Sequence, residues 1–408
     1  MAQTLSNFDE ALKIDYLPVV REQLENSTVL LNKIQRDEEN VEGKRWQLTA
    51  HYQRNSGVGA GSETALPTAG NQAYKNPYGN VRYNRGRIQV SGPTIKASKT
   101  NKGAMVRALD AEMQGVTRDL KKEVNYQLFN DGTSKRALVN GDPSTGTTLT
   151  LDNPGTMYLS EGMYLDIIDA SSGVAEDSDV VVTSVDSTTQ VTVSAALDAN
   201  IEDNSRVIRA DSTDGAGILP SDSYEMMGLK GIVDDATYVT TLHNLSRSTY
   251  NWWKCSTFST DDNSGTNRDL TLDLIQDAIT AVEKNGGEVN MILSSHDIRD
   301  TYVSLVTADK RFVNTLTLDG GWKALEYSSG GNGSIPWVAD VDCPPNTVFF
   351  IDTNHLRIMQ MSSWDWMQED GAILSRVSST DAYEAALFWY ADLATDRPRA
   401  FSFLRDVQ

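Results

Sequence analysis

The sequence predicts an α+β protein in which a long hairpin and a long helix precede an α/β body that is interrupted by a small all-β module. Three observations predict this class. Residues 41–97 are rich in Gly and Asn between alternating apolar flanks, residues 101–129 carry one continuous apolar stripe, and residues 145–211 hold short alternating runs without a helical period. No fixed repeat occurs, which excludes a solenoid.

Length and composition restrict the class of protein. The 408 residues suffice for two or three domains, and the net charge of −20 argues against a role in reading nucleic acid. No apolar run approaches the roughly 18–20 residues of a membrane helix, and the N-terminal residues lack the pattern of a secretory signal. Cys255 and Cys343 lie far apart without a CxxC motif. They predict a reduced, cytoplasmic setting, with a single disulfide left open.

Charge is distributed unevenly along the chain. Residues 41–136 hold 16 Lys and Arg against 7 Asp and Glu, whereas residues 142–235 hold 3 against 18. Opposite blocks of this size are typical of complementary surfaces between copies of one chain, or of a basic segment that faces an acidic partner. Two solvated surfaces that never meet are the open alternative.

Residues 1–40 are predicted to form an N-terminal arm. Apolar residues at every fourth position predict a helix over residues 9–25, which Pro18 kinks or divides. The stripe consists of Leu12, Tyr16, Val20 and Leu24. Because this region is too short to form a domain, we expect it to pack on another surface.

Residues 41–97 are predicted to form two extended strands with a long tip. Alternating apolar residues occur before and after the Gly-rich stretch: Trp46, Leu48, Ala50, then Val81, Tyr83, Ile88, Val90 and Ile95. A hairpin of this length is not stable alone in water. Its own chain offers no obvious platform, so we expect a neighbouring subunit to support it. A disordered loop is the alternative.

The strongest helical signal lies in residues 101–129. The apolar stripe comprises Met105, Leu109, Met113, Val116, Leu120, Val124 and Leu128, which spans about eight turns, or about 40 Å. Asn101 can cap its start, and Asn130-Asp131-Gly132 ends it. We expect this helix to act as a spine.

Five short alternating runs between residues 145 and 211 predict a small antiparallel barrel or sandwich with an acidic surface. After residue 228 the chain returns to an α+β body. A helix is predicted from Leu270 to Val282, a buried strand in VNMILSS, a second helix from His296 to Val306, and late strands in TVFFID, HLRIMQM, AILSRVS and EAALFWYADL.

No catalytic constellation is recognisable. The four histidines (His51, His243, His296 and His355) lack zinc-ligand spacing, and neither a GxSxG nor a GxxxxGK[ST] motif occurs. The acidic runs at residues 176–179 and 261–263 do not match a calcium loop and are interpreted as solvated turns. The chain is therefore predicted not to be an enzyme and to carry no metal or cofactor.

The order of arm, hairpin, spine helix, α/β part and strand-rich end resembles the Hong Kong 97-type capsid fold. Tailed-bacteriophage major capsid proteins and encapsulin shells share that fold. Local stretches also resemble the family, namely GLKGIVDD, NGGEVNMILSS, NTVFFIDTNHLRI and the run from WDWMQEDGAILS to AFSFL. The resemblance covers nearly the whole chain apart from residues 145–211.

The resemblance implies a division into domains. It assigns an N-terminal arm (1–40), an extended E-loop hairpin (41–97), the P-domain spine helix (98–144), an inserted β-barrel or sandwich domain (145–211), the P-domain continuation (212–265), and an A-domain whose C-terminal strands return to the P-domain (266–408). The long scaffolding segment of some relatives is absent, which implies a separate scaffolding protein or none.

The function that the resemblance implies is that of a major capsid protein. Such a chain self-assembles as pentamers and hexamers into an icosahedral phage head around packaged double-stranded DNA, without sequence-specific binding and without a membrane. It is assembled in the host cytoplasm and resides in the virion, with a scaffolding protein, a portal and a decoration protein as partners. The expected inter-subunit contacts are the basic residues Arg54, Lys75, Arg82, Arg85 and Arg87.

Two alternatives stay open from the sequence. An encapsulin-like compartment shell would have the same fold and would enclose a cargo enzyme. A secreted glycan-binding protein would be built around residues 145–211 and would be a monomer, but the sequence shows neither a signal peptide nor recognisable paired carboxylates.

Overall fold

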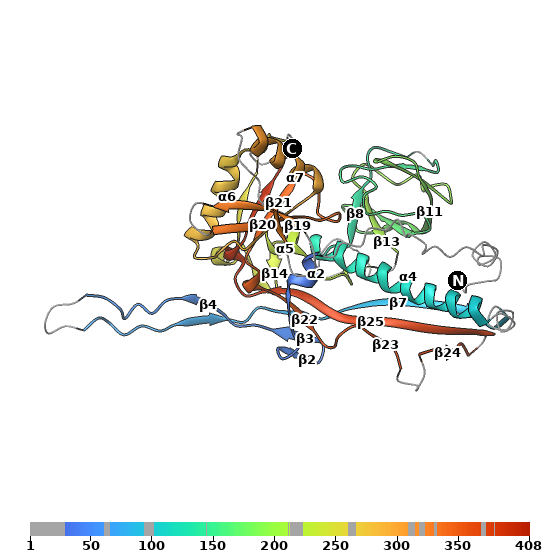
Figure 1. Ribbon diagram of the computed structural model, residues 1–408, viewed down its shortest axis with the longest axis horizontal. Coiled ribbons are helices and arrows are strands. Elements are labelled where there is room, and N and C mark those ends of the chain that lie inside the picture. Colours follow the sequence, from blue (N-terminus) through green and yellow to red (C-terminus); the bar gives the residue numbers. More distant parts are fainter. Residues whose placement is uncertain are drawn as a thin grey trace.

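Four parts of the chain are separate in space (Figure 1). A narrow hairpin projects to one side, a long helix lies along an extended sheet, and a β-barrel and an α/β unit lie on the other side of that helix. The computed structural model describes the chain except residues 1–28, 61–65, 94–101, 144, 211, 213–222, 260–266, 309–314, 318–322, 330–332, 369–372 and 379. The mixture of helices and sheets confirms the predicted α+β class.

The first described element leads directly into the main sheet. Helix α2 (Val29–Lys33) is followed by β1 (Gln35–Asp37), which pairs in parallel with β22 (Leu356–Gln360). Leu30 is fully buried and fixes α2 to the core. The helix predicted over residues 9–25 lies outside the described residues.

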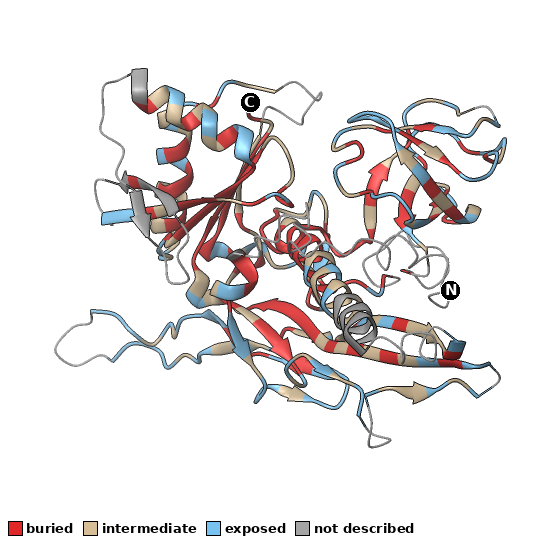
Figure 2. Ribbon diagram, turned by 45° about the vertical axis from the view of Figure 1, so that its right-hand side comes forward, coloured by how far each residue is buried: buried red, intermediate tan, exposed pale blue. Residues whose placement is uncertain are grey.

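The projecting hairpin is built from two small antiparallel ladders. Near the body, β3 (Arg45–Gln47) pairs with β2 (Val41–Glu42) and with β6 (Tyr78–Asn80). Further out, β4 (Ala50–Gln53) pairs with β5 (Ala73–Lys75). Figure 2 shows that most of this part is exposed or half-buried, so it contributes little to the core of its own chain.

The hairpin is shorter than the predicted residues 41–97. Strand β7 (Arg82–Ser91) leaves it and pairs antiparallel with β25 (Ala382–Thr395) over ten residues. This places β7 in a six-stranded sheet with β1, β22, β23 (Asp365–Trp366) and β24 (Ser375–Arg376). The prediction was wrong here because alternating burial identifies a strand but does not identify its partner.

The predicted spine helix is confirmed. Helix α4 (Lys102–Phe129) has 28 residues and ends before Gly132, whose φ of +75° is readily adopted only by glycine. Leu120, Val124 and Leu128 are buried as the stripe predicts. The predicted cap, Asn101, lies outside the described residues. Along its length α4 packs on β7, and near its C-terminus it joins a core shared with both large sheets.

The inserted module is a closed barrel. Its strands follow the order β8 (Lys135–Leu138), β13 (Arg206–Arg209), β10 (Tyr164–Ile168), β11 (Ala175–Val185), β12 (Gln190–Val193) and β9 (Thr148–Thr150). A bridge between Val139 and Leu151 joins the last strand to the first. Closure removes the unpaired strand edges that favour aggregation. All five predicted strands occur. The barrel also contains a sixth strand, β8, which lies before residue 145 and was not predicted because its short sequence lacks a clear alternation.

The α/β unit contains the predicted helices α6 (Leu272–Lys284) and α7 (His296–Ala308). They accompany a seven-stranded sheet of β16 (Ser256–Phe258), β26 (Ser402–Arg405), β21 (Thr347–Ile351), β17 (Met291–Ser294), β20 (Gly333–Ala339), β19 (Lys323–Ser329) and β18 (Thr315–Thr317). Every residue of β17 and β21 is buried, which explains their continuous apolar sequences.

Short elements connect the large ones. These are α5 (Leu229–Ile232), β14 (Thr241–Leu242), β15 (Leu245–Ser246), and the 3₁₀ turns η2 (Asn251–Trp253), η4 (Thr353–His355) and η5 (Pro398–Ala400). Cys255 and Cys343 are both buried and free, so the disulfide left open by the sequence is not formed. Among the described helices, none is long and apolar enough to cross a membrane.

Candidate functional site

The base of the hairpin is fixed to its own chain. The ring of Tyr52 stacks on Trp252 at 5.2 Å, and the ammonium group of Lys75 lies 5.4 Å from the ring centre of Tyr250. The backbone N–H of Tyr78 donates to the carbonyl of His243 at 3.2 Å. The chain therefore does offer a platform, contrary to the expectation from the sequence, but only for the half of the hairpin that lies nearer the body.

The distal half of the hairpin presents apolar side chains to solvent. Val58 is 85% exposed and Leu66 is 94% exposed. Single exposed apolar residues are common, but these two belong to the projecting hairpin, most of which is exposed or half-buried (Figure 2). This arrangement is typical of a surface that another molecule covers.

The five basic residues predicted as contacts fall into two groups. Arg54 and Lys75 lie on the hairpin, with Arg54 exposed, whereas Arg82, Arg85 and Arg87 lie on β7 beside the spine helix. For Arg85 and Arg87 the contacts within the chain are defined. The Nε of Arg87 donates to Glu384 at 2.9 Å, and the guanidinium of Arg85 lies 5.6 Å from the ring centre of Tyr83 and 5.7 Å from that of Tyr390. The structure therefore separates residues that the sequence analysis treated as one set.

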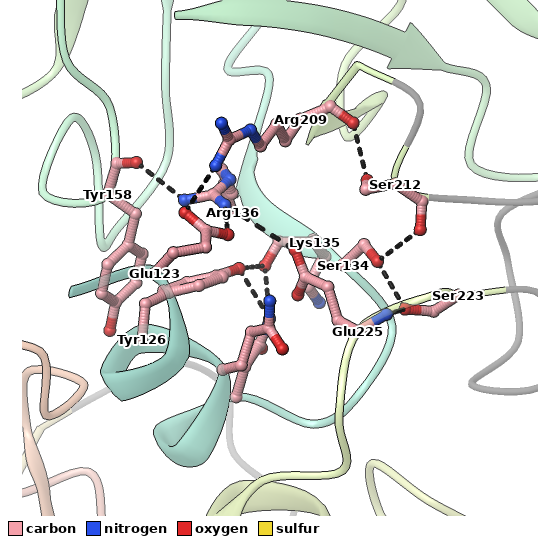
Figure 3. Close-up of polar contacts among 12 residues, drawn as sticks. Glu123, Tyr126, Ser134, Lys135, Arg136, Tyr158, Arg209, Ser212, Ser223 and Glu225 are labelled. Carbon is pink, nitrogen blue, oxygen red and sulfur yellow. Dashed lines mark hydrogen bonds and ion pairs between the residues drawn. The ribbon is translucent and has the colours of Figure 1, made fainter. Parts of the chain in front are cut away.

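A buried polar cluster joins the barrel to the spine helix (Figure 3). Arg136 of β8 forms an ion pair with Glu123 of α4, donates to the carbonyl of Tyr158 at 3.2 Å, and lies 4.3 Å from the ring centre of Tyr126. Arg209 of β13 reaches the other carboxyl oxygen of Glu123 at 3.0 Å. One carboxylate of the helix thus holds two strands of the barrel.

Glu225 is the unusual member of this cluster. Its side chain is 3% exposed and lies 3.7 Å from Arg136, and neither of its carboxyl oxygens has a hydrogen-bond partner. Burial raises the pKa of Glu225 to about 8, although Arg136 opposes this shift. For Glu123 burial acts in the same direction, but the two arginines outweigh it and hold its pKa below the ordinary value. The cluster therefore holds two buried carboxyls whose pKa values are shifted in opposite directions.

A second buried cluster joins the spine helix to the α/β unit. The side-chain amide of Asn125 donates to Asp340 at 2.9 Å and to Asp342 at 2.8 Å. Burial raises the pKa of Asp340 to about 7. The hydroxyl of Tyr158, which is contributed by the barrel, donates to the carbonyl of Asp342 at 3.1 Å. Barrel, helix and α/β unit therefore meet around one helical turn.

Sequence reasoning missed both polar clusters. Glu123 and Asn125 lie on α4 away from the apolar stripe, where the helical pattern predicts solvent. Nothing in the local sequence indicates that another part of the chain covers that face. Residues 41–136 include Arg136 and hold 16 Lys and Arg against 7 Asp and Glu. This excess of basic residues was the sequence feature that came nearest to indicating the clusters.

Two of the four histidines, His243 and His355, have surroundings that indicate a structural role. His243 is buried, and burial lowers its pKa to about 3, with the neighbouring Arg247 acting in the same direction. His355 closes a short turn and lies 2.8 Å from Asp396. Within the described residues no group of three or more His, Cys, Asp or Glu side chains could hold a metal ion.

The fold and the exposed hairpin define the class of protein: a shell subunit with the Hong Kong 97-type capsid fold. The model of one protein family, the SU10 major capsid protein, matches residues 161–385, which is more than half of the chain. The chain therefore belongs to the SU10 major capsid protein family. No curated protein sequence matches it significantly.

Solved structures with the same fold cover nearly the whole chain. The capsid of cyanophage A-1(L) has a TM-score of 0.59 at 16% identity and covers 98% of both chains. The holo-SrpI encapsulin of Synechococcus elongatus PCC 7942 has a TM-score of 0.50 at 9% identity and covers 100% of this chain and 96% of its own. The capsid of the native GTA particle has a TM-score of 0.50 at 8% identity and covers 100% and 99%. These likenesses concern the fold.

The family assignment decides between the functions left open by the sequence. The chain is a major capsid protein, a structural component of a phage head, and it is located in the capsid of the virion. The encapsulin shares the fold but matches less closely than the cyanophage capsid, and the glycan-binding alternative has no support from these matches.

Proposed function

We propose that copies of this chain form pentamers and hexamers that close into an icosahedral head, with the hairpin of each copy lying on its neighbour. The observation that carries this proposal is the exposure of Val58 and Leu66 on the described part of the hairpin. Covering apolar surface contributes roughly 25 cal/mol per Å². A gain of this kind, repeated at each interface, stabilises a shell made of many weak contacts.

The basic residues of the hairpin set its orientation more than its affinity. Arg54 is exposed, and Lys75 is half-buried over Tyr250. Each surface ion pair contributes only about 0–1 kcal/mol. We propose that Arg54 and Lys75 face acidic or polar groups of the adjacent copy, and that the β7 residues Arg82, Arg85 and Arg87 contribute at the edge of the same interface.

The barrel is proposed to face outward. Residues 140–205, which form four of its six strands, contain 12 Asp and Glu and no Lys or Arg, so the basic residues of the barrel are confined to β8 and β13. A surface of one sign keeps assembled particles apart in solution. It also repels packaged double-stranded DNA, so the outer face of the head is the side on which this charge does no harm.

The remaining features of the proposal concern partners. We propose that the head encloses DNA without sequence-specific contacts, assembles in the host cytoplasm without enzymatic activity, and depends on a separate scaffolding protein and a portal. We propose that a decoration protein binds to the acidic barrel. The barrel is a closed unit that lies beside the rest of the chain (Figure 1).

Electron microscopy tests this function. The chain is expressed alone and together with its neighbouring genes, and the particles are imaged. We expect capsomers or shells, and we expect Leu66→Asp to abolish them while Val185→Asp on the barrel does not. A soluble monomer under every condition would contradict the proposal.

A further inference from the structure

The spine helix forms one wall of a cavity that faces away from the barrel. The cavity has a volume of about 360 Å³ and lies between α2, α4 and β23. Trp366 and Leu387 contribute its apolar surface, together with Trp364, which stacks on the buried Trp389 at 4.5 Å. Two half-buried tryptophans around a cavity form an apolar surface that favours being covered.

Two exposed cations lie at the same cavity. Arg36 lies in β1 and Lys121 lies on α4, while Asp365 is the one acidic residue among the lining residues. The combination of tryptophan, leucine and two cations fits an amphipathic segment with apolar and acidic side chains. This chain contains such a segment.

Residues 9–25 have the required chemistry. Their apolar residues recur at every fourth position, and they contain five acidic residues against two basic ones. The described chain begins at Val29, and Leu31 and Asn32 already line the cavity. Four residues lie between Leu24 and Val29, so even a fully extended chain of five steps keeps Leu24 within about 17 Å of Val29.

We propose that residues 20–25 of the N-terminal arm occupy this cavity in the same chain, with Val20 and Leu24 against the tryptophans and Glu22 and Glu25 beside Arg36 and Lys121. The short tether favours the chain's own segment over that of a second copy. A tether of a few residues gives an effective concentration in the millimolar range. A cavity of this size takes a few side chains, so the contact is limited to the part of the arm nearest Val29.

Docking of the arm links three elements that are far apart in the sequence. It ties residues before α2 to the middle of the spine helix and to β23, on the face opposite to the barrel clusters. The arm would then reinforce α4 from one side while the barrel holds it from the other. This role goes beyond the contacts proposed for the hairpin and does not require a shell.

Paired cysteines test the proposal. Leu24→Cys is combined with Thr117→Cys, which lines the cavity, or with the control Asp119→Cys, which lines the cavities on the barrel side of α4. The native cysteines are buried and do not compete. After mild oxidation, peptide mass spectrometry of dissociated chains should show the Leu24–Thr117 pair linked within one chain, and the control pair unlinked.

A mixture of the two single-cysteine variants provides the second arm of the test. No cross-linked dimer is expected from it. A dimer from the mixture without a link in the double variant would show that a second copy occupies the cavity, and equal linking of both pairs, or of neither, would also overturn the proposal. Because a link within one chain forms whether or not shells form, this outcome is separate from failure of assembly.

Limited trypsin digestion provides a readout without new cysteines. Leu24→Asp should speed cleavage after Arg21 by about fivefold or more, because a segment released from a contact is cut in proportion to its open population. The control Asn26→Asp adds the same charge off the stripe and should leave the rate unchanged. Equal rates in the native chain and in Leu24→Asp would contradict docking.

Discussion

Replacing Glu225 with glutamine tests the polar cluster that joins the barrel to the spine helix. In the folded chain the pKa of Glu225 is about 8, compared with about 4.5 for a solvated glutamate, because burial disfavours the charged form. Between these two values the folded chain keeps a proton that the unfolded chain has lost. The free energy of unfolding must therefore fall as the pH rises from 4.5 to 8.

The magnitude follows from the size of the shift. Each pKa unit corresponds to about 1.4 kcal/mol, so a shift of three to four units makes the native chain about 4–5 kcal/mol less stable at pH 8 than at pH 4.5 through this group alone. Glutamine has nearly the shape of the protonated acid and cannot ionise. Near pH 4.5 the free energy of unfolding of Glu225→Gln should be almost the same as that of the native chain. At pH 8 it should be several kcal/mol higher.

Urea unfolding of the dissociated chain at pH 5, 6, 7 and 8 measures this difference as a shift of the midpoint. Glu384→Gln is the matched control, because it removes a carboxylate from the ion pair with Arg87, whose side chain is 63% exposed. Such a pair contributes about 0–1 kcal/mol, so the control should keep the native slope. If Glu225→Gln also keeps the native pH slope, Glu225 is not protonated in the folded chain and the reasoning fails.

Four further substitutions give contrasting results. Arg136→Ala should lower the stability by about 3–5 kcal/mol in thermal unfolding, because it leaves Glu123 buried with its main partner removed, whereas Arg209→Ala, at a half-exposed position, should cost about 1 kcal/mol or less. Trp389→Ala should cost about 3–5 kcal/mol, because its ring is fully buried in the large core. Leu66→Asp should leave the melting temperature of the monomer within about 1 °C while abolishing shells in electron micrographs, because Leu66 has almost no contact with its own chain.

The periodic elements could be predicted from the sequence because their signals are local. Apolar stripes in α4 and α6 each indicate one buried helix face. The continuous apolar run of β21 indicates a strand that is buried on both faces. The partners of these elements could not be predicted in the same way. Strand β7 was assigned to the hairpin because its alternation fits any half-buried strand, while its partner, β25, lies nearly 300 residues away.

The polar part of the site was hidden for a related reason. Arg136 and Glu225 are charged residues in polar surroundings of the sequence, and composition predicts that such residues face solvent. They are buried because the barrel folds back onto α4 and the chain after the barrel closes over them (Figure 3). This buried environment forms only when segments that are far apart in the sequence come together in the fold, so no local sequence pattern could indicate it.

The positions of the charges suggest how the chain can form reversible contacts with its neighbours and still keep its own fold. The surface proposed for assembly uses exposed apolar residues and weak, solvated ion pairs, which can break and form again while a shell corrects errors. The joint between barrel and helix uses the opposite chemistry, with Arg136 and Glu123 buried in one cluster whose separation would leave charges uncompensated. A subunit with labile outer contacts and a firm inner joint can change neighbours without losing its own shape. We therefore expect the barrel to stay attached to α4, and any rearrangement of a shell to take place at the hairpin and at the edges of the subunit.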